Sequence, residues 1–210
     1  MRFFSSIALA LLAAATAVPL PARAQSHRPA FGLYAGVDNS TMKGDSVPGP
    51  LHKSGFLGGA FLTWALSDRL ALQPELVFAQ KGVTTLDARP KGIVSTDIRV
   101  SYVEIPLLLR INGAALHGGV TPFALLGPEI ALKAACSVAV GGLSGRYTCK
   151  DVGDGLEAGD FGGIAGAGID FRIGTRIYSL SARYDYGMSN VVKNNAAKNL
   201  SFGVLLGMRL

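Results

Sequence analysis

The C-terminal residues 199–210 alternate between large apolar side chains and smaller or polar ones. The apolar set is Leu200, Phe202, Val204, Leu206, Met208 and Leu210. Because alternate side chains of an extended chain point to opposite faces, the pattern predicts a β-strand with one apolar face and one face of small or polar side chains. In water, such a strand would expose its apolar face and promote aggregation, whereas a bilayer would cover it. We therefore expect the closing strand of a transmembrane β-barrel.

The N-terminus has the features of a secretory signal peptide. Arg2 is followed by an apolar stretch over residues 7–18 and by the small-x-small sequence Ala22-Arg23-Ala24. The apolar stretch is too short to cross a bilayer as a mature helix. We predict a signal peptide over residues 1–24 and an outer-membrane β-barrel domain over residues 25–210.

The composition fits a barrel better than a soluble domain or a helical membrane protein. Mean hydropathy is +0.35 and only 16% of residues are charged, yet the mature chain has no uninterrupted apolar run of helical-span length. Barrel strands explain both facts, because their apolar residues are spread over alternate positions. The formal charge of +6 falls to about +4 when Arg2 and Arg23 leave with the leader. No basic stripe interleaved with aromatic residues accompanies it, so we expect no nucleic-acid partner.

The same alternation recurs along the chain and predicts an all-β fold, an eight-stranded antiparallel up-and-down transmembrane β-barrel. The predicted strands are residues 31–39, 55–66, 70–83, 98–111, 120–133, 159–173, 177–190 and 199–210. Long and short connections largely alternate between them, as in outer-membrane barrels whose short turns face the periplasm. An even strand number lets the last strand pair with the first and removes sheet edges. We expect local bulges at Pro74, Pro106 and Pro128, because proline lacks a ladder donor.

The two cysteines, Cys136 and Cys149, both fall in the longest predicted loop, residues 134–158. In an exported protein, such a pair predicts a disulfide. The bond would close a loop of about 14 residues and stabilise it by about 3 kcal/mol in the chain-entropy model. The three histidines show no ligand spacing, so we expect no metal site.

Four segments carry a resemblance to a known family. They are LQPELVF at residues 72–78 followed by Lys81-Gly82, SYVEIPLLLR at 101–110, LGPEI at 126–130 and RYDYG at 183–187. Together they resemble the PorT-like family of outer-membrane β-barrel domains, also described broadly as porin-family proteins. The similarity covers essentially the whole mature chain. It implies the barrel fold and a location in the cell outer membrane, and most members of the family have no assigned activity.

Charged residues occupy the face opposite the apolar stripe. If that stripe meets lipid, these residues fill the lumen, which in an eight-stranded barrel is just wide enough for side chains. The predicted lumen charge network is Glu75, Lys81, Glu104, Arg110, Glu129, Asp170, Arg172, Arg183 and Asp185. Glu75, Glu104 and Glu129 lie on three consecutive strands at similar depth and need cationic partners. We expect Arg183 to be the main one, since its planar fork can bind two carboxylates, with Arg110 below it and Lys81 above.

No motif indicates enzymatic chemistry. The chain has no Gly-x-Ser-x-Gly elbow and no phosphate-binding loop, and we expect neither catalysis nor a cofactor. Expected partners are outer-membrane lipid, lipopolysaccharide and the outer-membrane assembly machinery, and we expect a monomer. The lysines near the outer rim are either solvated loop charges or ligands for lipopolysaccharide phosphates. These are Lys43, Lys53, Lys91, Lys133, Lys150, Lys193 and Lys198.

Two functional hypotheses remain open, together with one alternative fold. The first is an integral barrel with a plugged, charge-paired lumen and a structural or surface-interaction role through its extracellular loops. The second is a narrow pore or an accessory component of transport or secretion. The alternative fold is a soluble lipocalin-like barrel, which would reverse the two faces, with the apolar side chains inside and the Glu and Arg residues in solvent.

Overall fold

The computed structural model describes residues 29–43, 50–89, 92–141, 145–149, 157–190 and 197–210. The signal peptide predicted over residues 1–24 lies outside the described residues. The described chain is almost entirely β-strand, with one short 3-10 helix, η1 (His117–Gly119). The strands are β1 (Ala30–Lys43), β2 (Pro50–Ala65), β3 (Leu70–Arg89), β4 (Gly92–Asn112), β5 (Val120–Val140), β6 (Tyr147–Thr148), β7 (Gly159–Ile173), β8 (Arg176–Gly187) and β9 (Lys198–Arg209).

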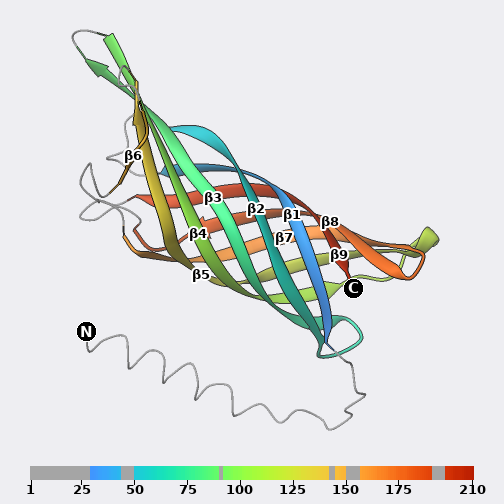
Figure 1. The fold of residues 1–210 in the computed structure, drawn as a ribbon. Helices are drawn as coiled ribbons and strands as arrows, with labels where there is room; N and C mark the ends of the chain where they lie inside the picture. Colours follow the sequence, from blue (N-terminus) through green and yellow to red (C-terminus); the bar gives the residue numbers. More distant parts are fainter. Residues whose placement is uncertain (1–28, 44–49, 90–91, 142–144, 150–156, 191–196) are drawn as a thin grey trace, which may run out of the picture.

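Eight of these strands form a closed antiparallel barrel. Sequence neighbours pair with one another, β9 pairs with β1, and the additional pairing of β4 with β5 closes the sheet. The ninth strand, β6, is only two residues long and pairs with β5 outside the barrel wall. The predicted eight-stranded up-and-down barrel is therefore confirmed (Figure 1).

The two ends of the barrel differ. At the end where the C-terminus lies, β2 is joined to β3 and β7 to β8 by short turns, and we call this the short-turn end. One of these turns contains Gly174 at φ +62°, a left-handed conformation that glycine adopts without strain. At the opposite, long-strand end, the hairpin of β3 and β4 projects beyond the other strands (Figure 1).

Several strands are longer at the long-strand end than the alternation predicts. The predicted loop over residues 84–97 is instead a continuation of β3 and β4, which stay paired up to Arg89 and Gly92. In the same way β1 reaches Lys43, β2 begins at Pro50 and β5 reaches Val140. These extensions contain many Thr, Val and Ile residues, which favour strands, and in water they need no apolar alternation. The prediction that these polar segments form loops is therefore wrong.

The prolines interrupt the ladders without bulging them. Pairing of β3 with β4 keeps one register on both sides of Pro74, and β5 pairs with β7 through Pro128 without a shift. The register of β4 with β5 is likewise unchanged around Pro106 and shifts instead between Ser101 and Tyr102. The expected proline bulges are therefore wrong. A proline can lie at a position where a ladder hydrogen bond is missing, while the residues on either side keep the same pairing register.

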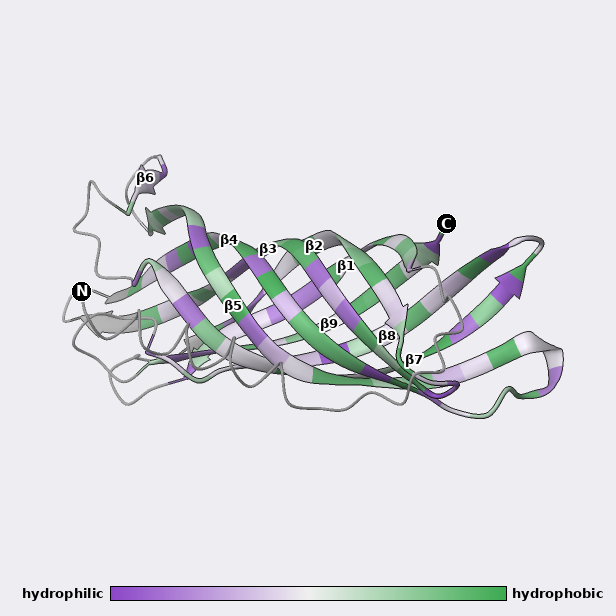
Figure 2. Ribbon diagram, turned by 90° about the horizontal axis from the view of Figure 1, so that it is seen from below, coloured by the Kyte–Doolittle hydropathy of each residue, from purple (hydrophilic) through white to green (hydrophobic). Residues whose placement is uncertain are grey.

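The two faces of the wall have the predicted polarity. On β9, Phe202, Val204 and Leu206 are 51%, 43% and 59% exposed, whereas the intervening Leu205 is 2% exposed. Hydropathy alternates along the other strands in the same way (Figure 2). Apolar side chains therefore cover the outside of the barrel, and the lipocalin-like alternative is excluded.

Apolar side chains also fill parts of the lumen. One cluster, which includes Met42, Val83, Val100 and Tyr102, lies towards the long-strand end. A second contains Tyr34, Phe61, Val77 and Leu205, and a third contains Leu108, Phe123, Leu125 and Ile164. The charged side chains described below are packed among these clusters.

Candidate functional site in the lumen

Three groups of charged side chains lie inside the barrel. Strand alternation turns them inward, and most of the predicted network is buried. Glu75, Lys81, Glu104, Arg110, Glu129 and Asp170 are each at most 7% exposed. Arg183 and Asp185 are partly buried, with side chains 11% and 14% exposed. Ionised groups removed from water in this way require partners.

The first group, which we call the Glu75 cluster, joins opposite walls of the barrel. Arg183 on β8 donates to both carboxylate oxygens of Glu75 on β3, at 2.6 Å and 3.0 Å. The hydroxyl of Tyr34 and the amide of Gln73 donate to the same carboxylate, at 2.6 Å and 2.7 Å. The guanidinium carbon of Arg183 also lies 4.8 Å from the centroid of the Tyr34 ring. Glu75 is therefore fully hydrogen-bonded, and Arg183 is held by an ionic contact and by the ring.

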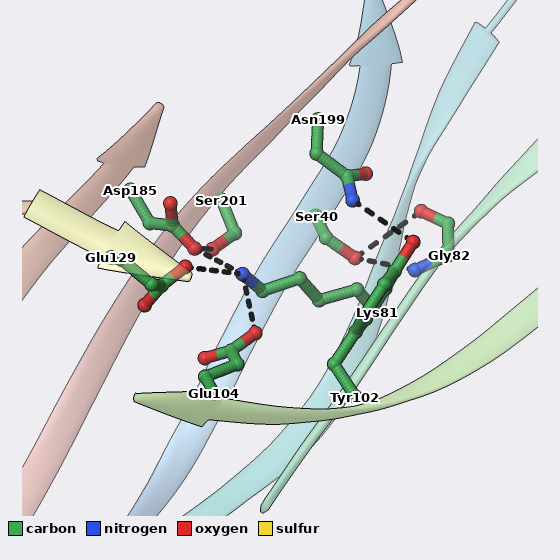
Figure 3. Close-up of polar contacts among 9 residues, drawn as sticks. All are labelled: Ser40, Lys81, Gly82, Tyr102, Glu104, Glu129, Asp185, Asn199 and Ser201. Atoms are coloured by element: carbon green, nitrogen blue, oxygen red, sulfur yellow. Dashed lines mark hydrogen bonds and ion pairs between the residues drawn. The ribbon is translucent and has the colours of Figure 1, made fainter. Parts of the chain in front are cut away.

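The second group, the Lys81 cluster, places one ammonium among three carboxylates (Figure 3). The Nζ atom of Lys81 is 2.7 Å from Glu104 Oε1 and 3.8 Å from Glu129 Oε1, and it also binds Asp185. The Oγ atom of Ser201 donates to Asp185 at 3.5 Å. Carboxylate oxygens of Glu104, Glu129 and Asp185 lie within 4.8 Å of one another. Of the described residues, these three form the group with the spacing of metal ligands.

The third group, the Asp170 cluster, lies towards the short-turn end. Arg110 and Arg209 each donate to Asp170 Oδ2 at 2.7 Å. Arg110 also donates through Nε to Asn112 at 2.9 Å, and its guanidinium carbon lies 3.6 Å from the centroid of the Phe123 ring. Here two cations share one carboxylate, which is the opposite balance of charge to that of the Lys81 cluster.

The observed partners differ in part from the expected ones. Of the three glutamates, Arg183 binds only Glu75, while Glu104 and Glu129 bind Lys81. Arg172 must be removed from the proposed network. It is exposed near the end of β7, and no ion pair to another described residue involves it. Alternation gives Arg172 the inward direction, but at the mouth of the barrel this direction leads into solvent.

Sequence reasoning missed two polar partners and two further buried carboxyl groups. Tyr34 and Gln73 complete the shell of Glu75, while Asp38 and Asp160 are 2% and 9% exposed. The sequence does indicate that Tyr34 and Asp38 point inward, because they alternate with the apolar Leu33 and Val37 on the first strand. The predicted network begins with Glu75 on the third predicted strand, so it omits Tyr34 and Asp38 on the first.

The space left inside the barrel is small. A cavity of about 30 Å³ lies between the Glu75 and Lys81 clusters and is lined by Tyr34, Lys81, Glu129, Arg183 and Asp185 among others. A larger, polar pocket of about 270 Å³ opens at the short-turn end beside Asp170 and Arg209. On the outer surface, an apolar groove of about 360 Å³ runs beside Gly163, Ala165 and Tyr186.

The two cysteines form a disulfide, as predicted, with Cα atoms 5.4 Å apart. Cys136 lies in β5 and not in a loop, and Cys149 directly follows β6. The bond thus ties the short β6 segment to the long-strand end of β5. Residues 150–156 of the predicted 134–158 loop lie outside the described residues.

Among the described residues, no helix has the length and hydropathy needed to cross a bilayer. No curated protein matches the sequence. Similar solved structures include Ail, the attachment invasion locus protein of Yersinia pestis, solved with the heparin analogue sucrose octasulfate. It is 15% identical over 87% of this chain and 99% of that chain, with a TM-score of 0.46.

Two further similar structures are the Neisserial surface protein A and the outer membrane protein OprG from Pseudomonas aeruginosa. Each is 13% identical over 86% of this chain, covering 97% and 95% of those chains, with TM-scores of 0.49 and 0.47. Residues 23–193 match the family model described as the outer membrane protein beta-barrel domain. With its closed eight-stranded barrel and apolar outer surface, the chain belongs to this family of outer-membrane β-barrel proteins.

Proposed function

We propose that this protein is a non-enzymatic outer-membrane barrel of PorT-like type, with a lumen closed by its own charged side chains. Its role would be structural or in surface interactions at the long-strand end, which we assign to the cell exterior because short turns of such barrels face the periplasm. The observation that carries the closed lumen is the contact of Arg183 with Glu75 across the barrel, beside a cavity of only about 30 Å³.

The closed lumen follows from the energetics of these contacts. A hydrated ion could pass only if pairs such as Arg183–Glu75 and Lys81–Glu104 opened. Breaking a buried pair by removing one partner costs about 3–5 kcal/mol, because the other charge is left without compensation. Packed aromatic and aliphatic side chains, including Tyr34, Phe61 and Leu205, occupy the space beside the Glu75 cluster. We therefore expect at most brief, rare openings.

The surface role is supported by the parts that project from the barrel. The hairpin of β3 and β4 is fully paired out to Arg89 and Gly92, and β5 carries the disulfide-bound β6 segment beside it. A paired, cross-linked projection loses little conformational entropy on binding a partner. These elements would present the connecting loops, whose central residues lie outside the described part of the chain.

Lipopolysaccharide is the partner that the outer surface suggests. Lys43 on β1 and Lys198 on β9 are directly paired in the ladder at the long-strand end. Like charges placed directly opposite one another destabilise a sheet unless an anion binds them. Lys198 also lies 5.5 Å from the ring centroid of Tyr186, which lines the apolar outer groove. Lys53 is less suitable, because its ammonium already binds Asp97.

Current measurements on the refolded protein in planar lipid bilayers test the closed lumen. We expect no steady current from the wild-type chain. The variant Arg183→Ala, which removes the contact across the barrel, should open measurable conductance, and Arg172→Ala should not. A steady, ion-selective current through the wild-type protein that changes with Glu104→Ala would contradict the proposal. That result would favour the narrow pore or transport component.

A further inference from the structure

The Lys81 cluster contains more carboxyl groups than its one ammonium can pair with fully. Three carboxylates, those of Glu104, Glu129 and Asp185, contact Lys81 directly. Glu104 and Glu129 are 4% and 3% exposed, so bulk water does little to screen them. The Oε2 atom of Glu129 is buried and has no hydrogen-bond partner among the described residues. The site therefore retains an uncompensated acceptor.

Asp38 adds a fourth carboxylate with no direct partner. It is 2% exposed, and neither of its oxygens is hydrogen-bonded to another described residue. Asp38 nevertheless interacts electrostatically with Lys81, Glu104 and Asp185. Its ladder neighbours on both sides are glycines, Gly55 and Gly203, which offer it no side-chain donor. A buried carboxylate left in this way is costly unless a cation reaches it.

Gly55 brings Asp38 close to the strand that carries Lys81. A Cβ atom at Gly55 would lie 2.6 Å from Asp38 Oδ1 and 1.8 Å from the backbone carbonyl oxygen of Gln80. Only glycine permits this approach. Lys81 directly follows Gln80, and its long, flexible stem can carry the ammonium to more than one partner. Asp38 thus lies close enough to Lys81 to interact with it electrostatically and offers its ammonium an alternative carboxylate.

The oxygen spacing of the cluster is compatible with a divalent cation such as Ca²⁺. Ca²⁺ binds oxygen ligands at about 2.3–2.6 Å, so two ligands on opposite sides of it are about 5 Å apart. The carboxylate oxygens of Glu104, Glu129 and Asp185 lie within 4.8 Å of one another. Mg²⁺ also fits within this limit, but it dehydrates reluctantly and usually keeps several bound waters, for which the cavity of about 30 Å³ leaves little room.

We propose that Glu104, Glu129 and Asp185 form a Ca²⁺ site in the lumen, which the Lys81 ammonium fills in the structure described here. When Ca²⁺ enters, the ammonium moves to Asp38, so that the exchange leaves neither cation without a carboxylate. The two arrangements differ in whether a lysine side chain or a free ion holds the three strands β4, β5 and β8 together. The Asp170 cluster, with its excess of arginine, is not a site of this kind.

Calorimetric titration of the refolded, chelator-treated full-length protein in a neutral detergent tests this proposal. We expect one saturable Ca²⁺ site per chain and weaker binding of Mg²⁺. Removing a ligand charge with Glu129→Gln should weaken Ca²⁺ binding by about ten-fold or more. The matched control is Asp170→Asn, which removes a carboxylate from the Asp170 cluster and should leave Ca²⁺ binding unchanged.

Two further variants separate ion exchange from simple adhesion of Ca²⁺ to acidic groups. Lys81→Met removes the competing ammonium and should tighten Ca²⁺ binding. Asp38→Asn removes the alternative carboxylate partner of Lys81 and should weaken Ca²⁺ binding. If Lys81→Met folds only when Ca²⁺ is present during refolding, that result also supports the site. The proposal is overturned if wild type and refolded Lys81→Met both fail to bind Ca²⁺ saturably. It is equally overturned if Glu129→Gln and Asp170→Asn alter binding alike.

Discussion

Arg183 and Glu75 are 108 residues apart in sequence, yet two hydrogen bonds join their side chains across the inside of the barrel. The side chain of Glu75 is fully buried, and that of Arg183 is 11% exposed. Tyr34 on a third strand donates to the same carboxylate. The contact therefore fixes three strands of the wall relative to one another, in addition to the backbone ladders.

Replacing Arg183 by methionine should strongly destabilise the barrel. The substitution preserves a long stem but leaves the Glu75 carboxylate buried without a cation, at a cost of about 3–5 kcal/mol. Urea unfolding of the refolded protein, followed by tryptophan fluorescence and heat-modifiable migration, measures the change. Adding Glu75→Gln should recover part of the loss, since the neutral amide needs no cation. The control Arg172→Met should change stability by no more than about 0.5 kcal/mol, because Arg172 is exposed.

Gly168 on β7 should not tolerate a side chain. A Cβ atom there would lie 2.6 Å from the Phe123 ring, on which Arg110 is stacked, and 2.4 Å from the carbonyl oxygen of Leu180. Gly168→Ala should therefore destabilise the protein by about 1–3 kcal/mol in the same unfolding assay. Gly163→Ala, on the outer face of the same strand, provides the comparison. The nearest atom to its new Cβ is the flexible end of Met188, at 3.2 Å, so we expect almost no change.

The disulfide should stabilise the projecting end of β5 and not the barrel itself. Bond closure spans a sequence separation of 13 residues and should contribute about 3 kcal/mol of local stability. The double variant Cys136→Ser/Cys149→Ser should be cleaved faster by protease in residues 137–148, while its heat-modifiable migration stays unchanged. Reduction of the wild-type protein should reproduce the faster cleavage. Loss of the folded barrel in the double variant would contradict this division.

The lysine pair at the long-strand end should bind anionic lipid. Each lysine near a negatively charged surface contributes about 1 kcal/mol, so Lys43→Gln/Lys198→Gln should weaken binding of lipopolysaccharide by about ten-fold or more. Lipopolysaccharide titrated into the protein in neutral detergent micelles provides the measurement. Arg69→Gln removes an exposed cation from the short-turn end and should have no effect. Equal effects of the two changes would show that the attraction is general.

Alternation of side chains was sufficient to predict the barrel, its strand number and the direction of each face. A lipid-covered strand cannot shift by one residue without turning its polar side outward, so the pattern on β9 was strongly constrained. The strand ends at the long-strand end were not predictable in this way. Beyond the bilayer, residues 84–97 no longer need an apolar face, and their Thr-rich sequence resembles a loop although it stays paired.

The charged residues of the lumen were largely predictable, but their partners were not. Alternation gives the direction of Glu75, Lys81 and Arg183, while the choice of partner depends on strand stagger, which the sequence does not display. Glu104 and Glu129, which were expected to bind Arg183, therefore bind Lys81 instead. Arg172 was misplaced because alternation does not indicate where the wall ends and solvent begins.

Lipid accessibility along β9 tests the account most directly. Single cysteines at positions 202 to 207, each carrying an environment-sensitive fluorophore, can be compared in vesicles that contain a lipid-bound quencher. We predict strong quenching at positions 202, 204 and 206, where the native side chains face outward, and little at 203, 205 and 207. Quenching at positions 203, 205 and 207 alone, or at neither set, would contradict a barrel whose apolar face meets the membrane and whose charges are enclosed.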